Sequence, residues 1–405
     1  MTGGLRGDAV VAGVAEYAPE RKYTGPRVMT LEQWGDLAAI ALEDAGIPAS
    51  DVDGLVCSTV RESEMFVPST IAEYLGWQVN YAERVDLGGA TPVGMLWRAA
   101  AAIELGLCEV VVCAAPARPT PSMPAHMPRS WSPFGASSAI MGSPQAEFEI
   151  PYGNLAQNGG YAMIANRYGA EFGYDPRATA KIAADQRTNA CANPDAVFFG
   201  KPITVDDVLA SKMVADPLHV LEIVMPCAGG AAIVVTSAER AEKARKAGAS
   251  HRPVHVVGCG EHLAHKTPTY TPDLIRTPVG KAADRAFDMA GIARADVDVL
   301  EPYDCYTITV LLTIEDSGFC EKGQGMSFVQ EHDLTYRGDF PVNTHGGQLG
   351  FGQAGLAGGF SQLIEGVRQV RGNCDERQVS NCDVALITGT GGIMSEQAAV
   401  LLRGA

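Results

Sequence analysis

Apolar residues along the chain recur at two kinds of interval, one typical of helices and one typical of buried strands. Leu31–Ala45 and Val279–Ala290 carry apolar and small residues three and four positions apart, which predicts a helix in each half of the chain. Each run stops at a glycine, Gly46 or Gly291, which can take the left-handed conformation of a helix C-cap. A short apolar run follows each glycine and predicts a buried strand.

The two helix and strand units also repeat as sequence. Residues 45–55 read AGIPASDVDGL and residues 290–300 read AGIARADVDVL, so Ala-Gly-Ile, Asp-Val-Asp and Leu return in the same order and at the same spacing. The strands that follow are predicted at Leu55–Ser58 and Val297–Leu300. Two copies of one supersecondary unit predict duplicated halves that pack against each other.

Strands and helices alternate through both halves, which predicts a layered α/β fold. Further strands are predicted at Ala9–Val14, Glu109–Ala115, Gly229–Thr236, Val254–Gly258, Val384–Thr388 and Gln397–Leu402. Further helices are predicted at Pro68–Leu75, Val93–Leu105, Gly160–Phe172, Arg177–Ala190, Thr307–Gly318 and Phe360–Val370. We expect an N-terminal half over residues 1–250 and a C-terminal half over residues 251–405.

The N-terminal half contains an insertion over residues 116–215. Its first part, Pro116–Gly160, is rich in Pro, Ser, Met and Gly and has no apolar period of its own. Insertions of this kind often cover or shape a site, although a flap that only faces a partner protein would have the same composition. Near the end of the insertion, Lys201–Asp216 predicts an extended, hairpin-like segment.

Composition narrows the class of protein. With 405 residues, 46% apolar and 19% charged, the chain can bury a large core. A net charge of −16 opposes binding to nucleic acid or to an anionic membrane, and leaves only a local basic pocket for a phosphorylated ligand. The ten cysteines show no C-x-x-C pair and no metal-ligand spacing, so we expect buried thiols, no metal and a reducing, cytoplasmic location. No apolar run reaches the roughly 18 residues of a membrane span, and no signal peptide is expected.

Two glycine-rich turns are candidates for holding a ligand. Residues 85–91, VDLGGAT, precede the Ala-rich predicted helix, whose first backbone N–H groups would point at the turn and could hold an electronegative group. Asn343–Gly359 allows close backbone approach and positive φ angles. It is not a P-loop, because no Gly-Lys-Ser/Thr follows, and it does not lie in the usual context of a dinucleotide fingerprint.

Several segments together resemble the thiolase superfamily. They are the duplicated halves, the insertion, NPDAVFFGKPITVDDVLASKMVADPL at 193–218, NTHGGQLG at 343–350 and ALITGTGG at 385–392. The similarity covers nearly the whole chain and is greatest to the sterol-carrier and lipid-transfer-protein branch. It implies a thiolase-like five-layered αβαβα fold and a homodimer that acts on acyl-coenzyme A thioesters, with coenzyme A present as part of the substrate and no other cofactor.

Three positions that carry catalysis in thiolases hold other residues here. The nucleophilic cysteine, which would form a covalent thioester, falls on Gly89. The histidine of the Gly-His-Pro turn falls on Gln353, and the second cysteine falls on Thr388. Cys305 could be offered as a substitute nucleophile, but it lies beside an apolar helix and is interpreted as a packing residue. These departures argue against thiolysis.

The segment Glu301–Tyr306, EPYDCY, replaces the thiolase Asn-Glu-Ala-Phe motif and puts Tyr303 at the Asn position. Steroid side-chain aldolases of the lipid-transfer-protein branch are similar, with Tyr-Asp here and Asn-Thr-His-Gly-Gly later. The resemblance implies retro-aldol cleavage of a β-hydroxyacyl-CoA, possibly a steroid side-chain thioester, and a small partner protein with an OB-fold and a zinc ribbon.

Retro-aldol chemistry needs a proton-transfer group and a donor for the enolate oxygen. Tyr303 is the predicted proton-transfer group, and a phenol acting as a base at neutral pH would need its pKa lowered by a nearby donor or dipole. His345 is the predicted enolate donor, with backbone N–H groups near Gly89 and at Thr390 and Gly391. The alternatives are a core tyrosine and a histidine that only pins Gly346.

The aldolases of this group carry a second tyrosine after His-Gly-Gly, whereas this chain has none beyond Tyr336. Gln353, or a group from the insertion, would have to supply the second proton transfer. Two other functions stay open at this point: a thiolase-fold acyltransferase with non-standard groups, and a non-catalytic subunit that binds acyl-CoA.

Overall fold

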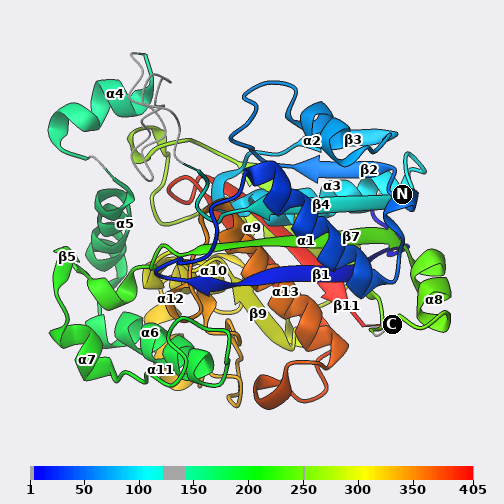
Figure 1. The fold of residues 1–405 in the computed structure, drawn as a ribbon. Helices are drawn as coiled ribbons and strands as arrows, with labels where there is room; N and C mark the ends of the chain where they lie inside the picture. Colours follow the sequence, from blue (N-terminus) through cyan, green and yellow to red (C-terminus); the bar gives the residue numbers. More distant parts are fainter. Residues whose placement is uncertain (1–3, 122–141, 155, 250, 405) are drawn as a thin grey trace.

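The computed structural model describes residues 4–121, 142–154, 156–249 and 251–404. Nine strands form one mixed sheet in the order β3-β2-β4-β7-β1-β8-β11-β10-β9 (Figure 1). Their bounds are β1 Ala9–Glu20, β2 Gly54–Cys57, β3 Tyr81–Arg84, β4 Val110–Pro116, β7 Ala228–Ser237, β8 Val254–Leu263, β9 Val299–Pro302, β10 Val384–Gly391 and β11 Glu396–Arg403. A separate hairpin joins β5 Met213–Ala215 to β6 Leu218–His219.

The two ends of this sheet have the same topology. From each outer side inward, a parallel pair is followed by two antiparallel neighbours: β2-β4-β7-β1 in one half and β9-β10-β11-β8 in the other. The halves join where β1 and β8 pair through Val10 with His255 and Val11 with Val254. Only β3, at one edge, has no counterpart in the other half of the described sheet. Residue 250, the predicted boundary, lies outside the described residues, so the division of the chain at that point stays a prediction.

Helices lie on both faces of the sheet and between its halves. The principal ones are α1 Thr30–Ala45, α2 Val67–Leu75, α3 Thr91–Glu104, α5 Gln157–Phe172, α6 Pro176–Cys191, α8 Ala238–Lys246, α9 Val279–Ala290, α10 Thr307–Asp316 and α13 Gly358–Arg371. The shorter ones are α4 Pro144–Phe148, α7 Val205–Ala210, α11 Gly325–Glu331 and α12 Gly347–Gly350. Among the described residues no helix is both long and apolar enough to cross a lipid bilayer.

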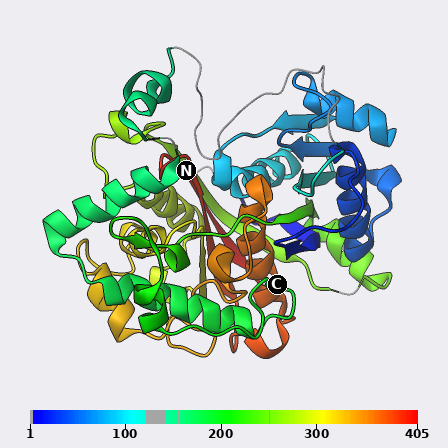
Figure 2. The same cartoon turned by 60° about the vertical axis from the view of Figure 1, so that its left-hand side comes forward.

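Two helices form the central layer. α3 and α13 contact each other and strands from both halves (Figure 2). Their apolar side chains share one core with the facing strands. α1 and α2 cover the outer face of the N-terminal half, whereas α9 and α10 cover that of the C-terminal half. The order is therefore outer helices, the N-terminal half of the sheet, the central helices, the C-terminal half of the sheet and outer helices, which is the five-layered arrangement that the family resemblance implied.

The central position of α3 follows from its sequence. TPVGMLWRAAAAIE is apolar or small on nearly every side, and an all-round apolar helix must be buried on every side. Gly94 leaves room for the side chain of Leu87, because a Cβ added at position 94 would lie only 2.6 Å from Cδ1 of Leu87. Because α3 is fixed between the two halves, its N-terminal turn at Gly88–Ala90 is held rigidly at the centre of the molecule.

The predicted hairpin at Lys201–Asp216 is partly wrong. Residues Val205–Ala210 form the helix α7, because Thr204 accepts a hydrogen bond from the N–H of Asp207 and the Asp207 carboxylate accepts from Thr204 in return. Only the short β5 and β6 are extended. Residues 122–141 of the insertion lie outside the described residues.

Candidate active site

The ends of two strands and the start of one helix meet at the centre of the molecule. Tyr303 directly follows β9, and its N–H donates to the carbonyl of Thr388 on β10 at 3.1 Å. The turn that starts α3 brings Gly89 against the same residues, because the Gly88–Ala90 turn packs on β10. The predicted site residues Tyr303, Gly89 and Thr390 therefore lie together.

Gly89 and Tyr303 are in direct contact. A Cβ added to Gly89 would lie 2.3 Å from Cζ and 2.4 Å from Cε2 of the tyrosine ring. Such distances are far below van der Waals contact, so the ring occupies the space that any side chain at position 89 would need. The glycine at the former nucleophile position is thus required by the tyrosine that replaces the asparagine.

Gln353 is the polar neighbour of the phenol. Its Nε2 donates to the Tyr303 hydroxyl at 3.5 Å and to the carbonyl of Gly355 at 3.1 Å. Its Oε1 is buried and has no hydrogen-bond partner among the described residues. The structure thus brings the predicted Gln353 into the site, with one buried acceptor atom that lacks a partner among the described residues.

The environment of Tyr303 contradicts the predicted shift of its pKa. Burial raises the pKa of Tyr303 above its ordinary value, the nearby Cys305 adds to this, and the hydrogen bond from Gln353 opposes it without reversing it. A lowered pKa was expected because a base at neutral pH would need one. Instead, the phenol is held neutral and can donate its proton.

Asp304, to which the sequence analysis gave no role, anchors the glycine-rich turn. Its buried carboxylate accepts hydrogen bonds from the N–H groups of Gln348 at 2.8 Å and Leu349 at 3.1 Å, and from Nε2 of Gln362 at 2.7 Å. A Cβ on Gly347, where φ is +60°, would lie 2.2 Å from Oδ2. Asp304 therefore explains the second glycine of His-Gly-Gly and fixes the turn that leads to Gln353.

Burial also raises the pKa of Asp304 to about 6, although the N–H groups of Gln348 and Leu349 oppose the shift. The only signal in the sequence for this role was the Tyr-Asp pair itself, because the partners of Asp304 lie more than 40 positions away along the chain.

His345 lies in a buried network of charged groups. Its Nδ1 is 3.3 Å from Oε2 of Glu301, and its ring packs edge-on against Phe351. Burial disfavours the charged imidazole, but Glu301 outweighs this effect and raises the pKa of His345. Among the described residues no hydrogen bond, ion pair or ring contact joins His345 to Tyr303. Its role as enolate donor stays a prediction.

The last residues of β10 pack against the turn before α3. The carbonyl oxygen of Thr390 would lie 2.4 Å from a Cβ on Gly89, and the Cα of Gly391 would lie 3.0 Å from one on Gly88. At Thr390 it is thus the carbonyl that faces Gly89. Thr388, at the position of the second thiolase cysteine, is buried, and its hydroxyl has no partner in the described part of the chain.

Cys305 behaves as a packing residue, as predicted. It is buried in the core of the C-terminal half, and burial, with the adjacent Asp304, raises its pKa to about 12. A thiol with this pKa is not a nucleophile at neutral pH. Tyr306, the next residue, stacks on Tyr161 of α5 with 4.1 Å between ring centroids, so the described part of the insertion borders the site.

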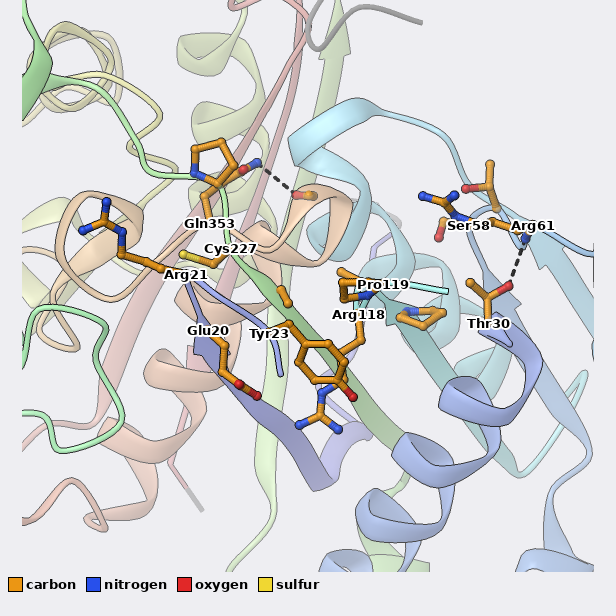
Figure 3. A pocket seen from close by; sticks show the side chains of 16 residues that line it. Glu20, Arg21, Tyr23, Thr30, Ser58, Arg61, Arg118, Pro119, Cys227 and Gln353 are labelled. Atoms are coloured by element: carbon orange, nitrogen blue, oxygen red, sulfur yellow. Dashed lines mark hydrogen bonds between the residues drawn. The ribbon is translucent and has the colours of Figure 1, made fainter. Parts of the chain in front are cut away.

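A cavity of about 560 Å³ opens beside this centre (Figure 3). Gln353 and Gly355 form one side of it, so the amide that contacts Tyr303 also faces the cavity. The remaining lining residues come from the ends of β1 and β4 and the segments after them, the segment after β2, the start of α1 and the segment that leads into β7: Glu20, Arg21, Tyr23, Thr30, Ser58, Thr59, Arg61, Pro116, Ala117, Arg118, Pro119, Pro226, Cys227 and Ala228. A small organic substrate fits such a volume.

Known proteins share both the sequence and the fold. Residues 260–404 match the family described as thiolase C-terminal domain-like. The chain is 31% identical over 401 residues to the steroid side-chain-cleaving aldolase of Thermomonospora curvata, with 96% of each chain covered. It is also 31% identical over 399 residues to the 17-hydroxy-3-oxo-4-pregnene-20-carboxyl-CoA lyase of Mycobacterium tuberculosis, covering 96% of this chain and 97% of the relative.

A solved structure agrees with these relatives. The Ltp2-ChsH2(DUF35) aldolase superposes with a TM-score of 0.83 at 28% identity, covering 99% of this chain and 98% of that one. Sequence identity over nearly the full length and a common fold confirm the resemblance described above. The chain belongs to the thiolase-fold family of steroid side-chain-cleaving aldolases, which are carbon–carbon lyases acting on acyl-CoA thioesters.

Proposed function

We propose that this protein cleaves the Cα–Cβ bond of a β-hydroxyacyl-CoA by a retro-aldol reaction that depends on Tyr303. The products are a ketone or aldehyde and a shorter acyl-CoA. The observation that supports this best is the contact between Tyr303 and Gly89: a thiol nucleophile at position 89 and the tyrosine ring exclude each other. A covalent acyl-cysteine, which thiolysis requires, is therefore not part of the reaction.

The phenol acts as a proton relay. Because its pKa is raised, Tyr303 is neutral at pH 7 and carries one proton to give and one oxygen to receive. As the Cα–Cβ bond breaks, the β-hydroxyl proton passes to the phenol oxygen, and the β-carbon becomes a carbonyl. In the same concerted step the electron pair of the broken bond, delocalised onto the thioester oxygen as enolate character, takes the original phenol proton at the α-carbon, so the phenol never carries two protons. Atoms and charges balance without a second tyrosine.

Gln353 positions this relay. Its Nε2 donates toward the phenol oxygen, and its free Oε1 can accept a hydrogen bond from the substrate. An amide does not ionise near neutral pH, so we assign Gln353 a hydrogen-bonding role rather than the proton transfer. The thioester oxygen is proposed to be held by backbone N–H groups near Gly89 and at Gly391, with His345 as the predicted side-chain donor; the N–H of Thr390 is left out, because its carbonyl is the group that faces Gly89.

Relatives suggest the substrate and the assembly. Their names specify a steroid side chain and a pregnene carboxyl-CoA, so we propose a bulky β-hydroxyacyl-CoA for this chain. The Ltp2 structure includes ChsH2, a DUF35 protein, and we propose an equivalent OB-fold and zinc-ribbon partner together with a homodimer. All ten cysteines are free thiols, which supports a reducing, cytoplasmic location. Coenzyme A enters only as part of the substrate.

The test is a lyase assay on the purified protein, alone and mixed with a DUF35 partner, using a branched β-hydroxyacyl-CoA and following carbonyl release. Tyr303→Phe should abolish release, and Tyr152→Phe, which changes a tyrosine that is 84% exposed, should not. Cleavage of a 3-ketoacyl-CoA that depends on free CoA would instead favour an acyltransferase. Binding without turnover, even with the partner present, would favour a non-catalytic subunit.

A further inference from the structure

The cavity beside the site carries three arginines that lack an acidic partner. Arg21, Arg61 and Arg118 all line it, and none of them takes part in an ion pair among the described residues. The chain holds 47 acidic and 31 basic residues, so carboxylates are plentiful, and the buried Arg371 and Arg377 are paired with Asp44 and Glu365. The only acidic residue in the lining is Glu20.

Arg118 is held in a fixed position. Its backbone N–H donates to Oε1 of the buried Gln33 at 3.0 Å, and its carbonyl accepts from Nε2 of the same side chain at 3.2 Å. Its guanidinium lies over the ring of Tyr17, 3.6 Å from the centroid, and 5.4 Å from that of Tyr23. The Nε of Arg118 is buried and has no partner in the described part of the chain. Stacking of this kind presents the planar cation without pairing it.

Arg61 is fixed only at its backbone. Its N–H donates to the hydroxyl of Thr30 at 2.9 Å, at the start of α1. Its guanidinium is exposed and makes no hydrogen bond or ion pair among the residues that the structure describes. The guanidinium of Arg21 lies 5.7 Å from the centroid of the Phe198 ring and takes part in no ion pair or hydrogen bond within the described part of the chain.

The three arginines stand at separate points around the cavity. Figure 3 shows Arg61 beside Ser58 on one side, Arg118 beside Tyr23, and Arg21 beside Cys227 and Gln353. Positive charge is thus distributed along a cavity that leads to the amide contacting Tyr303. Because the three side chains stand apart in Figure 3, a ligand with several anionic groups, or with one anionic group far from its reacting carbon, fits this arrangement better than a single small ion.

We propose that this arginine pocket, formed by Arg21, Arg61 and Arg118, binds oxyanion groups of the substrate. The groups are either phosphates of coenzyme A or a carboxylate on the part of the substrate that leaves as the carbonyl product. Guanidinium groups match both chemistries through paired N–H donors. The proposal rests on the proposed function only for the identity of the substrate, because binding of the oxyanion itself does not require turnover.

Calorimetric titrations with two probes test the proposal. Coenzyme A carries the phosphates without an acyl group, and glutarate carries carboxylates without phosphate. Arg61→Gln and Arg118→Gln should each weaken binding of one probe about tenfold, the size expected for losing one exposed charge-assisted hydrogen bond. Arg27→Gln removes the same charge from an exposed position outside the lining and should leave both affinities unchanged.

The pattern identifies the anion. Weaker binding of coenzyme A alone assigns the pocket to phosphate, and weaker binding of glutarate alone assigns it to carboxylate. Unchanged affinity for both probes in Arg61→Gln, whose exposed guanidinium can be lost without unfolding the protein, would overturn the proposal. Because these titrations involve no catalysis, absence of lyase activity in the wild type would refute the proposed function and leave this result standing.

Discussion

The Cβ that any residue other than glycine would place at position 89 falls 2.3 Å from Cζ of Tyr303. In a thiolase the nucleophilic cysteine would stand at this position, and the ring of Tyr303 now fills the space. The phenol at position 303 therefore excludes the thiol: with the Tyr303 ring in place, no side chain fits at position 89.

Restoring the cysteine should not restore thiolysis. Gly89→Cys and Gly89→Ala each force the Tyr303 ring to move, because Cζ and Cε2 lie where the new atom must go. We expect kcat for carbonyl release to fall at least roughly 100-fold, since general acid–base catalysis supplies a factor of that order. Retained lyase activity in Gly89→Ala, with an unchanged melting temperature, would show that the phenol is not required in its present place.

The pH dependence distinguishes a neutral phenol from a phenolate. Burial raises the pKa of Tyr303, so the group stays protonated through the neutral and mildly alkaline range. The rate of carbonyl release should therefore not increase between about pH 7 and pH 9 as it would if a phenolate had to form. A rate that climbs tenfold per pH unit in this range, and loses that climb in Tyr303→Phe, would contradict the relay.

Removing the Tyr303 hydroxyl should affect catalysis far more than stability. The hydroxyl makes one long hydrogen bond, 3.5 Å from Nε2 of Gln353, and the ring stays packed in Tyr303→Phe. We expect kcat to fall about 100-fold or more, and the free energy of unfolding to change by less than about 1 kcal/mol. Urea unfolding of both proteins, beside the assay, measures the two effects separately.

Asp304→Asn tests the anchor of the glycine-rich turn. The new amide group would place N–H donors against the N–H groups of Gln348 or Leu349, which costs about 2–3 kcal/mol of unfolding free energy. Activity should fall as well, because the same turn carries Gln353. Asp288→Asn, at an exposed position of α9, is the matched control and should leave stability and activity unchanged.

The wild type and Asp304→Asn should also differ in how their stability depends on pH. Burial raises the pKa of Asp304 from 3.8 to about 6, so its contribution to stability is fully present below pH 3.8 and is lost as the pH rises through 6. The melting temperature of the wild type relative to Asp304→Asn should therefore decrease between pH 4 and pH 6. A difference that is constant across this window would mean that the carboxyl does not titrate there.

Glu365 should account for much of the decrease in the free energy of unfolding at acidic pH. Its buried carboxylate bonds Nε and Nη2 of Arg377 at 3.0 and 3.1 Å. Burial disfavours the charge, but Arg377 outweighs it and lowers the pKa of Glu365 to about 2. Its contribution is present above pH 4.5 and is lost as the pH falls toward 2. Glu365→Gln should lower the free energy of unfolding by about 3–5 kcal/mol at pH 7. Urea unfolding of this variant should also show a smaller decrease in stability as the pH falls.

A surface pair provides the comparison for that variant. Glu376 bonds Arg337 at 2.8 Å, and both side chains are more than 60% exposed. Glu376→Gln should change the free energy of unfolding by less than about 1 kcal/mol, because solvent screens exposed pairs. If both glutamates gave equally small losses, the buried pair of Glu365 with Arg377 would not contribute to stability as described.

Much of the fold was readable from periodicity and repetition. Val279–Ala290 is a helix with the predicted bounds, both repeated units end at left-handed glycines, and the duplicated topology confirms the repeat. These features depend on neighbours within a few positions, which a sequence displays directly. The absence of a thiol at position 89 was equally visible, because it concerns the identity of a single residue.

Elements without a local signal were missed. β3 has the polar pattern YAER because it lies at the sheet edge, and α7 depends on the reciprocal cap between Thr204 and Asp207 within a segment that otherwise resembles a hairpin. In both cases local composition was compatible with more than one state, and packing selected one of them.

For the site, too, some features follow from local sequence and others only from tertiary packing. The sequence by itself determined the family, the lost nucleophile and the candidate Tyr303. Only the tertiary structure decided that the phenol is buried and neutral, that Asp304 holds the glycine-rich turn, and that unpaired arginines line the adjoining cavity. The physical reason is that desolvation, steric exclusion and charge pairing depend on which distant residues become neighbours, and that is settled only when the two halves pack together.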